Sequence, residues 1–166
     1  MGSDGNLVLF DHSRNMELWS TNVSVTSNST MAVIRDTGSL DVTDASNSSI
    51  IYWRSIDHPT NTWLPGGKLG MNKITGVIQR LVPWKNMADP SPGLFTLELD
   101  PNGTLQFFIR WNLSITYWSS GPWNGHNFTL APEMTIGLTF DIPFINNDIE
   151  GYLFYSLSDV GGQIKE

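Results

Sequence analysis

The chain has 166 residues, of which 40% are hydrophobic and 11% aromatic, a content of apolar side chains that excludes intrinsic disorder. This length can bury the core of one ordinary domain or of two small ones. The formal charge of −7 and the nine scattered Lys and Arg argue against binding to nucleic acid or to an anionic membrane, because both need clustered cations.

Short apolar runs, punctuated by Gly, Pro, Asn and Asp, predict an all-β protein. The first third contains an internal repeat, because the run Asp4 to Asp11 is echoed by residues 36–44 at an offset of about 33 residues. Each copy is followed by a tryptophan, Trp19 and then Trp53. We expect each copy to form a turn, a strand and a returning strand that ends near its tryptophan.

The start of the first copy suits a sugar ligand. On a strand, Leu7 and Leu9 would point into the core, because side chains alternate between the two faces. The residues of the opposite face are Asp4, Asn6, Val8 and Phe10. A carboxylate, an amide and small apolar groups in a row match the hydroxyls and the C–H face of a sugar. An ordinary half-buried strand after an Asp-Gly turn fits the same pattern.

This stretch resembles the Gln-x-Asp-x-Asn-x-Val-x-Tyr motif of bulb-type mannose-binding lectins, which implies that Asp4 and Asn6 bind mannose hydroxyls and Val8 contacts the ring. Gly2 replaces the glutamine of the motif and Phe10 replaces its tyrosine. At about 1 kcal/mol for each lost hydrogen bond, the two changes would weaken binding roughly tenfold or more. The echo in the second copy departs further from the motif and is not expected to bind mannose.

A Pro- and Gly-rich connector is expected at residues 58–70. The run Trp53 to Gly70, which includes Pro59, is similar to the junction between the lectin domain and the S-domain in plant S-domain receptor-like kinases. The resemblance implies a lectin region at 1–57 and an S-locus glycoprotein-like region at 71–166. The run Asp89 to Phe95 is similar to the next signature of that family.

Four further strands are expected in the second part. Residues 94–99 and 104–111 read as a hairpin whose turn, residues 100–103, contains Pro and Asn-Gly. Asn102 would lie at the tip of this hairpin. Alternating runs at 135–142 and 151–157 indicate two more strands.

The run Tyr117 to Gly125 is the most distinctive segment, because two tryptophans bracket a Ser-Ser-Gly-Pro turn that leads into Asn-Gly. It closely resembles the tryptophan-rich motif of plant S-locus glycoproteins. We expect Trp118 and Trp123 to anchor the packing of a loop rather than to bind a ligand. The motif residues treated as a structural signature are Trp118, Gly121, Pro122, Trp123, Asn124 and Gly125.

Signals for N-glycosylation favour an extracellular location, although a β protein rich in Ser, Thr and Asn also contains such sequons by chance. Asn-x-Ser/Thr sequons, none with proline in the middle, occur at Asn22, Asn28, Asn47, Asn102, Asn112 and Asn127. The chain contains no cysteine, which excludes disulfides and thiolate metal sites.

The sequence offers an enzyme little. It has no cysteine nucleophile and no Gly-x-Ser-x-Gly elbow, and its three histidines fall in expected loops without metal-ligand spacing. No apolar run approaches the ~20 residues that cross a bilayer, and the first residues lack a signal-peptide pattern. We therefore expect no enzymatic activity, cofactor, metal, nucleic-acid partner or membrane segment in this chain.

Together the motifs resemble the ectodomain of plant G-type lectin S-receptor-like serine/threonine kinases. The resemblance implies an incomplete bulb-lectin β-prism, lacking roughly its first half, followed by a small antiparallel β region, with the kinase outside this segment. It also implies an extracellular, apoplastic position at the plasma membrane, a mannose-type glycan or another apoplastic ligand, homo- or hetero-association of receptors, and a role of the pollen-recognition type. A secreted mannose-binding lectin is the alternative, and a wall-associated glycosidase is a more remote one.

Overall fold

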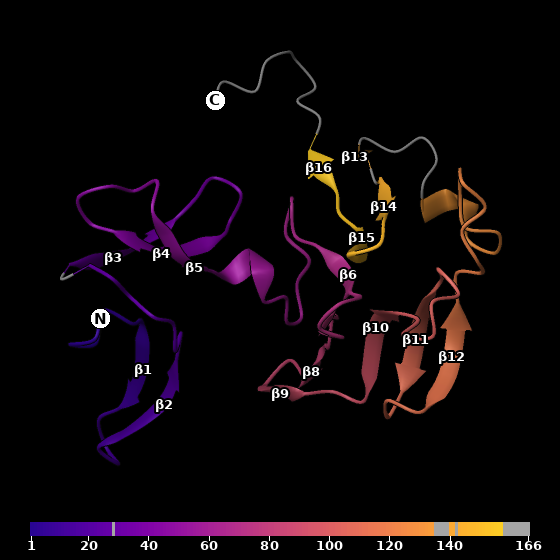
Figure 1. Cartoon of the computed structure of the whole chain (residues 1–166). Coiled ribbons are helices and arrows are strands. Elements are labelled where there is room, and N and C mark those ends of the chain that lie inside the picture. The colour runs from indigo at the N-terminus through magenta and orange to yellow at the C-terminus, as the bar shows by residue number, and fades with distance from the viewer. Residues whose placement is uncertain (28, 135–139, 142, 158–166) are drawn as a thin grey trace. The chain divides into compact units, whose positions relative to one another are not determined.

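The computed structural model describes residues 1–27, 29–134, 140–141 and 143–157, and within them it is an all-β protein with two short 3-10 helices (Figure 1). The predicted fold class is confirmed. The chain divides into two compact units, Met1–Ile56 and Asp57–Glu166.

The first unit contains two antiparallel sheets. One pairs β1 (Val8–Asp11) with β2 (Met16–Ser20). The other has the order β3-β4-β5, formed by β3 (Thr30–Ile34), β4 (Leu40–Asp44) and β5 (Ile51–Arg54). The 3-10 helix η1 (Ser55–Asp57) follows β5.

The internal repeat is confirmed as two equivalent hairpins, β1–β2 and β4–β5. Leu9 lies opposite Trp19 in the first hairpin, and Val42 lies opposite Trp53 in the second. The two indole rings meet edge to face, with centroids 5.6 Å apart. Each hairpin therefore places its tryptophan on the returning strand, and the two tryptophans pack together.

The two hairpins also turn in the same way. After β1, Asp11 accepts hydrogen bonds from the backbone N–H of Ser13 at 2.8 Å and from its hydroxyl at 2.7 Å. After β4, Asp44 accepts the same pair of bonds from Ser46, at 2.7 and 2.6 Å. An aspartate that bonds to the residue two positions later stabilises a tight turn at the end of the strand.

Two expectations about the first strand are wrong. The strand begins at Val8 rather than at Asp4, because Asp4 and Gly5 lie in a turn. Leu9 was expected in the core, but its side chain is 59% exposed. The reason is that β1 belongs to a two-stranded sheet, and no third described strand pairs with it. The exposed apolar residues of this hairpin are Leu9, Phe10, Met16, Leu18 and Trp19.

The second unit is built from several small antiparallel sheets. A four-stranded sheet has the order β14-β15-β6-β7, and a three-stranded sheet has the order β10-β11-β12 (Figure 1). Strands β6, β7, β14 and β15 are Leu69–Asn72, Ile78–Gln79, Phe144–Asn146 and Glu150–Leu153. Strands β10, β11 and β12 are Phe95–Leu99, Phe107–Trp111 and Ile115–Ser119. Leu69 and Gly70, expected in the connector, thus open a strand.

Two strand pairs and one helix complete this unit. Strand β8 (Trp84–Asn86) pairs with β9 (Asp89–Pro92), and β13 (Phe140–Asp141) pairs with β16 (Ser156–Leu157). The 3-10 helix η2 is Pro132–Met134. The expected strand at 151–157 is therefore split between β15 and β16, and most of the expected strand at 135–142 lies outside the described residues.

The predicted hairpin is confirmed as β10–β11, although both strands begin later than expected, the first at Phe95 instead of Leu94. Its second strand begins at Phe107 instead of Thr104. Leu105 has a positive φ of 55°, and the backbone N–H of Asp100 donates to the carbonyl of Gln106 at 2.9 Å. The loop therefore takes three more residues than the Asn-Gly signal predicts.

The core of the second unit lies where these elements meet. Its fully buried side chains are Leu69, Leu99, Phe107, Phe128, Ala131 and Leu153. Phe107 and Phe128 meet edge to face with centroids 5.7 Å apart. Burial of such aromatic and aliphatic groups supplies most of the driving force for folding.

Candidate functional site

Asn6 is the centre of the candidate sugar site, and the structure buries it. Its side chain is 5% exposed. The amide nitrogen donates to the Asp4 carboxylate at 2.9 Å and to the Val23 carbonyl at 3.1 Å. The amide oxygen accepts from the Thr21 hydroxyl at 2.7 Å and from the Val23 backbone N–H at 2.8 Å. These four bonds use the full capacity of the amide, so Asn6 positions other groups and has none left for a sugar.

Asp4 is the exposed end of this cluster. Its carboxylate accepts from the backbone N–H of Asn6 at 3.1 Å and from the Asn6 amide at 2.9 Å. These two hydrogen bonds hold the pKa of Asp4 below its ordinary value, and the bond from the backbone N–H has the larger effect. Asp4 lies at a depression of about 460 Å³ whose lining is mainly polar. The other lining residues are Met1, Gly2, Ser3, Gly5, Val25, Ser27, Ser29 and Thr30.

Val8 lies near Asp4, but neither Val8 nor Phe10 is among the residues that line the depression. A Cβ placed on Gly2 would be 2.6 Å from the Asp4 Oδ1 atom and 3.3 Å from the Val8 Cγ2 atom. The ring of Phe10 instead packs edge to face on His12, at 5.3 Å. The structure therefore groups Asp4, Asn6 and Val8 around Gly2. A glutamine at position 2 would need the Asp4 carboxylate to move.

Replacing Asn6 by alanine is expected to destabilise the first unit by about 2 kcal/mol, because the half-buried N–H and C=O of Val23 and the buried hydroxyl of Thr21 lose their partner. Urea unfolding followed by two-dimensional NMR would measure the change for this unit alone. Asp4→Ala is the matched control, since it removes only the exposed end of the cluster and should cost less. Equal effects of the two substitutions would contradict a positioning role for Asn6.

The second repeat has an ion pair where the first has this cluster. Asp41 is buried, accepts from the Ser39 hydroxyl at 2.7 Å, and lies 3.0 Å from the Nε of Arg35 and 3.7 Å from the Nε of Arg54. Its carboxylate is thus already satisfied within the protein.

The structure describes five of the predicted glycosylation sites. Asn22, Asn47, Asn102 and Asn112 are exposed, and Asn127 is half-buried. Asn102 lies in the β10–β11 loop, as expected. Asn28 lies outside the described residues.

The signature tryptophans are packing groups. Trp118, on β12, and Trp123 both pack against the core of the second unit. The Trp123 ring lies 5.1 Å from Phe128 and 5.4 Å from Phe144. In the first unit Trp53 packs on Trp19, as described above.

The polar residues of the signature shape its turns. Gly121 has a φ of 67° and Gly125 a φ of 99°, values that L side chains rarely adopt. The side-chain oxygen of Asn124 accepts from the backbone N–H groups of His126 and Asn127, both at 2.9 Å. Pro122 is exposed in this turn, and Pro59 is half-buried in the segment after η1.

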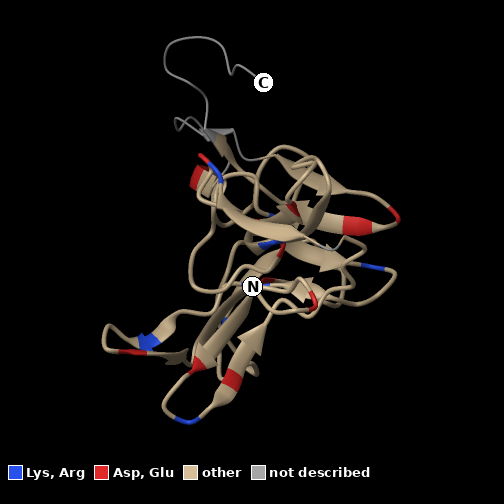
Figure 2. Ribbon diagram, turned by 90° about the vertical axis from the view of Figure 1, so that its left-hand side faces the viewer, with Lys and Arg blue, Asp and Glu red and all other residues tan. Residues whose placement is uncertain are grey.

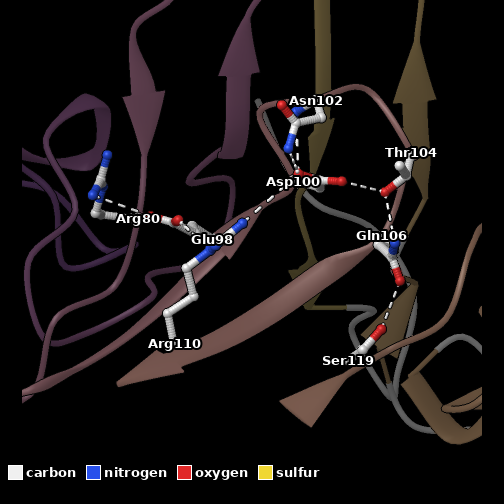
Figure 3. Close-up of polar contacts among 8 residues, drawn as sticks. All are labelled: Arg80, Glu98, Asp100, Asn102, Thr104, Gln106, Arg110 and Ser119. Atoms are coloured by element: carbon white, nitrogen blue, oxygen red, sulfur yellow. Dashed lines mark hydrogen bonds and ion pairs between the residues drawn. The ribbon is translucent and has the colours of Figure 1, made fainter. Parts of the chain in front are cut away.

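A buried network of charges on β10 and β11 was not anticipated from the sequence (Figure 3). Glu98 lies 2.9 Å from the Nε of Arg110 and 3.1 Å from the Nη1 of Arg80. Arg110 also approaches Asp100 at 3.8 Å. In the Glu98–Arg110 and Glu98–Arg80 contacts the charged atoms are close enough for an ion pair, but their angles do not allow a hydrogen bond. The attraction between these side chains is therefore mainly Coulombic.

The network continues through neutral side chains (Figure 3). Asp100 accepts from the backbone N–H of Asn102 at 3.1 Å and from the hydroxyl of Thr104. Thr104 accepts from Gln106 at 2.7 Å, and Gln106 accepts from the Ser119 hydroxyl at 2.6 Å. This chain of bonds ties the β10–β11 loop to β12.

A second depression, of about 370 Å³, was also missed, because the two residues that form its ion pair, Lys68 and Glu150, are 82 positions apart. Lys68 donates to Glu150 at 2.8 Å and lies 4.1 Å from the centroid of the Tyr152 ring. Burial lowers the pKa of Lys68, but its interactions with Glu150 and Tyr152 outweigh burial, and the net pKa is raised. Only the pairing of β15 with β6 brings these groups together.

Figure 2 shows basic and acidic residues interspersed along the described ribbons. Within the described part of the chain, no helix is long and apolar enough to cross a membrane. The same residues contain no group of three His, Cys, Asp or Glu side chains placed to hold a metal ion.

Comparisons with known proteins identify relatives of the whole segment. Residues 1–85 match the family described as D-mannose binding lectin. A G-type lectin S-receptor-like serine/threonine-protein kinase of Arabidopsis thaliana is 42% identical over 99% of this chain and 22% of its own length. Two other kinases of the same description and organism are 37% and 34% identical, over 96% and 99% of this chain and 20% and 18% of their own lengths.

The chain spans about a fifth of the length of these curated relatives. The lectin match continues past the boundary between the two compact units, which lies after Ile56. The chain belongs to the D-mannose binding lectin family, in the form found in the G-type lectin S-receptor-like serine/threonine kinases.

Proposed function

We propose that this chain is an extracellular carbohydrate-recognition module of a receptor-like serine/threonine kinase. The observation that carries the proposal is the Asp4 carboxylate, which the buried Asn6 amide fixes at a polar depression. This depression lies within the segment that matches the D-mannose binding lectin family. The proposed organisation is a lectin region at 1–57, a connector at 58–70 and an S-locus glycoprotein-like region at 71–166.

In the proposed binding mode, Asp4 accepts hydrogen bonds from sugar hydroxyls. Its low pKa keeps it ionised at neutral and mildly acidic pH, so it acts only as an acceptor. Ser27, Ser29 and Thr30 also line the depression and contribute polar groups. Val8, next to Gly2, offers an apolar contact for the C–H face of the ring. Mannose is the proposed sugar, and the affinity is expected to be weak because few groups converge.

The role of the whole receptor is part of the same proposal. Binding at the apoplastic face of the plasma membrane would be passed to the kinase region through homo- or hetero-association of receptors. A role in pollen recognition would use the S-locus glycoprotein-like region. No enzymatic step is assigned to the residues of this chain.

Titration with methyl α-mannoside, followed by calorimetry or by NMR, tests the sugar site. We expect saturable binding with a dissociation constant in the millimolar range, weakened roughly tenfold by Asp4→Ala. Asp36→Ala is the matched control, since Asp36 is exposed in the second repeat, and it should leave the binding unchanged. Heats equal to buffer dilution, or equal losses in the two variants, would reject the Asp4 site.

A further inference from the structure

The connection between β11 and β12 has three residues, 112–114, and the first two have an uncommon backbone. Asn112 and Leu113 have positive φ values of 50° and 57°, and the N–H of Ser114 donates to the carbonyl of Trp111 at 3.2 Å. Two consecutive central residues with positive φ define a type I′ turn, in which Asn-Gly is the favoured pair. Asn112 is therefore well suited to its position, whereas the bulky Leu113 is held there at an energetic cost.

Asn112 is also the asparagine of a sequon, with Ser114 as its hydroxyl residue. Its backbone N–H donates to the carbonyl of Leu94 at 2.7 Å, which fixes the turn against the start of β10. Asn112 is exposed, and its side-chain amide makes no hydrogen bond to a described residue. The amides of Asn102 and Asn127, in contrast, are each hydrogen-bonded within the protein.

An aromatic surface begins at the residue before Asn112. Trp111 lies between its cross-strand partners, Phe95 on β10 and Ile115 on β12. The ring of Phe95 meets that of Tyr117 at 5.6 Å, edge to face. The exposed fractions are 40% for Phe95, 42% for Trp111, 55% for Ile115 and 74% for Tyr117. This apolar end of the three-stranded sheet is thus open to solvent at the base of the turn.

We propose that an N-linked glycan on Asn112 folds back onto this surface, with its first N-acetylglucosamine against the Trp111 indole. The C–H face of a pyranose is apolar and slightly positive, and it complements the negative face of an aromatic ring. The attachment point is the neighbouring residue, so the effective concentration of the sugar at the indole is high without any separate binding event. The glycan then covers apolar surface that the protein leaves exposed.

Attachment uses a chemistry that this sequon allows. The Nδ2 atom of Asn112 bonds to the anomeric carbon of an oligosaccharide carried on a lipid pyrophosphate. The bond from that carbon to the phosphate oxygen breaks, the lipid pyrophosphate leaves, and Nδ2 loses one proton. The inference rests on the proposed extracellular placement, because the transfer occurs on the secretory route.

The test compares four variants of the chain secreted from a eukaryotic cell line: the parent, Ser114→Ala, Trp111→Ala and the double variant. Glycopeptide mass spectrometry is expected to show Asn112 occupied in the parent and empty in Ser114→Ala. Loss of this glycan should make the Tm of Ser114→Ala about 3–5 °C lower than that of the parent. The Tm of the double variant should be less than about 1 °C lower than that of Trp111→Ala. Ser24→Ala is the control, because it removes the sequon of Asn22, which follows Thr21 and not an aromatic residue. It should change Tm by less than about 1 °C.

A measurement on the parent alone avoids any effect of Trp111→Ala on folding. After enzymatic trimming to a single N-acetylglucosamine, the sugar protons on Asn112 should shift upfield in the NMR spectrum through the indole ring current. Unshifted protons, or an equal loss of Tm with and without Trp111, would overturn the proposal. Glycans at other sequons but none at Asn112 would overturn the glycan proposal and leave the proposed extracellular placement intact. An absence of glycans at every sequon would contradict both.

Discussion

Replacing Arg110 by alanine is expected to destabilise the second unit by about 3–5 kcal/mol. Arg110 lies 2.9 Å from Glu98 and 3.8 Å from Asp100, and both carboxylates are buried (Figure 3). Without the guanidinium, Glu98 would keep its contact with Arg80 but Asp100 would lose its contact with a cation, and a buried charge without a partner is costly. Urea unfolding of the second unit, monitored by two-dimensional NMR, gives the change in the free energy of unfolding.

Arg80→Ala is the matched control for this prediction. Arg80 contacts the same glutamate, but its side chain is 34% exposed against 16% for Arg110, so water can replace much of its charge. We expect a loss of about 1 kcal/mol or less for Arg80→Ala. Similar losses for the two arginines would show that burial does not set the strength of the network.

Gly121→Ala is expected to destabilise the second unit by about 3 kcal/mol. Two unfavourable effects add. The first is backbone strain, because residue 121 has a φ of 67°. The second is steric overlap, because a Cβ atom would lie 2.3 Å from the Thr129 hydroxyl and 2.9 Å from the Leu130 backbone nitrogen. A left-handed conformation costs an L residue roughly 1–2 kcal/mol, and overpacking adds a similar amount. Thermal or urea unfolding would measure the sum.

Gly125→Ala separates the two effects. Gly125 also has a positive φ, 99°, but a Cβ atom there would meet nothing within 4 Å. This control should therefore show only the backbone cost, about 1–2 kcal/mol. Equal losses of stability in the two variants would contradict the prediction that close packing around Gly121 adds to the backbone cost.

Local signals in the sequence were enough to predict much of the fold. Asp-Gly and Asn-Gly turns and the two spaced tryptophans located the repeated hairpins and the β10–β11 pair, because residues close in sequence form these elements. The signature tryptophans pack as expected, because a rigid Gly-Pro corner places them next to the core. Strand limits were less accurate, since side chains such as Asp4 and Asp100 bond to nearby backbone groups and replace strand by turn.

The candidate sites depend on contacts between residues that are distant in the sequence. The alternation of side chains between the two faces of a strand does not predict such contacts. Asn6 was expected on the outer face, but it precedes β1 and turns inward to satisfy Thr21 and the backbone of Val23. Glu150 reaches Lys68 only after β15 pairs with β6. Burial of a polar group is decided by such distant partners, which a single sequence does not identify.

Asp4 is proposed to mark a sugar-binding depression in the lectin segment. The most direct test is chemical-shift mapping by NMR during titration of the isotopically labelled chain with methyl α-mannoside. We expect the amide signals of Asp4, Gly5 and Thr30 to shift along one saturation curve, while those of residues around Asp36 and in the second unit stay in place. Absent shifts, or shifts confined to residues away from Asp4, would contradict it.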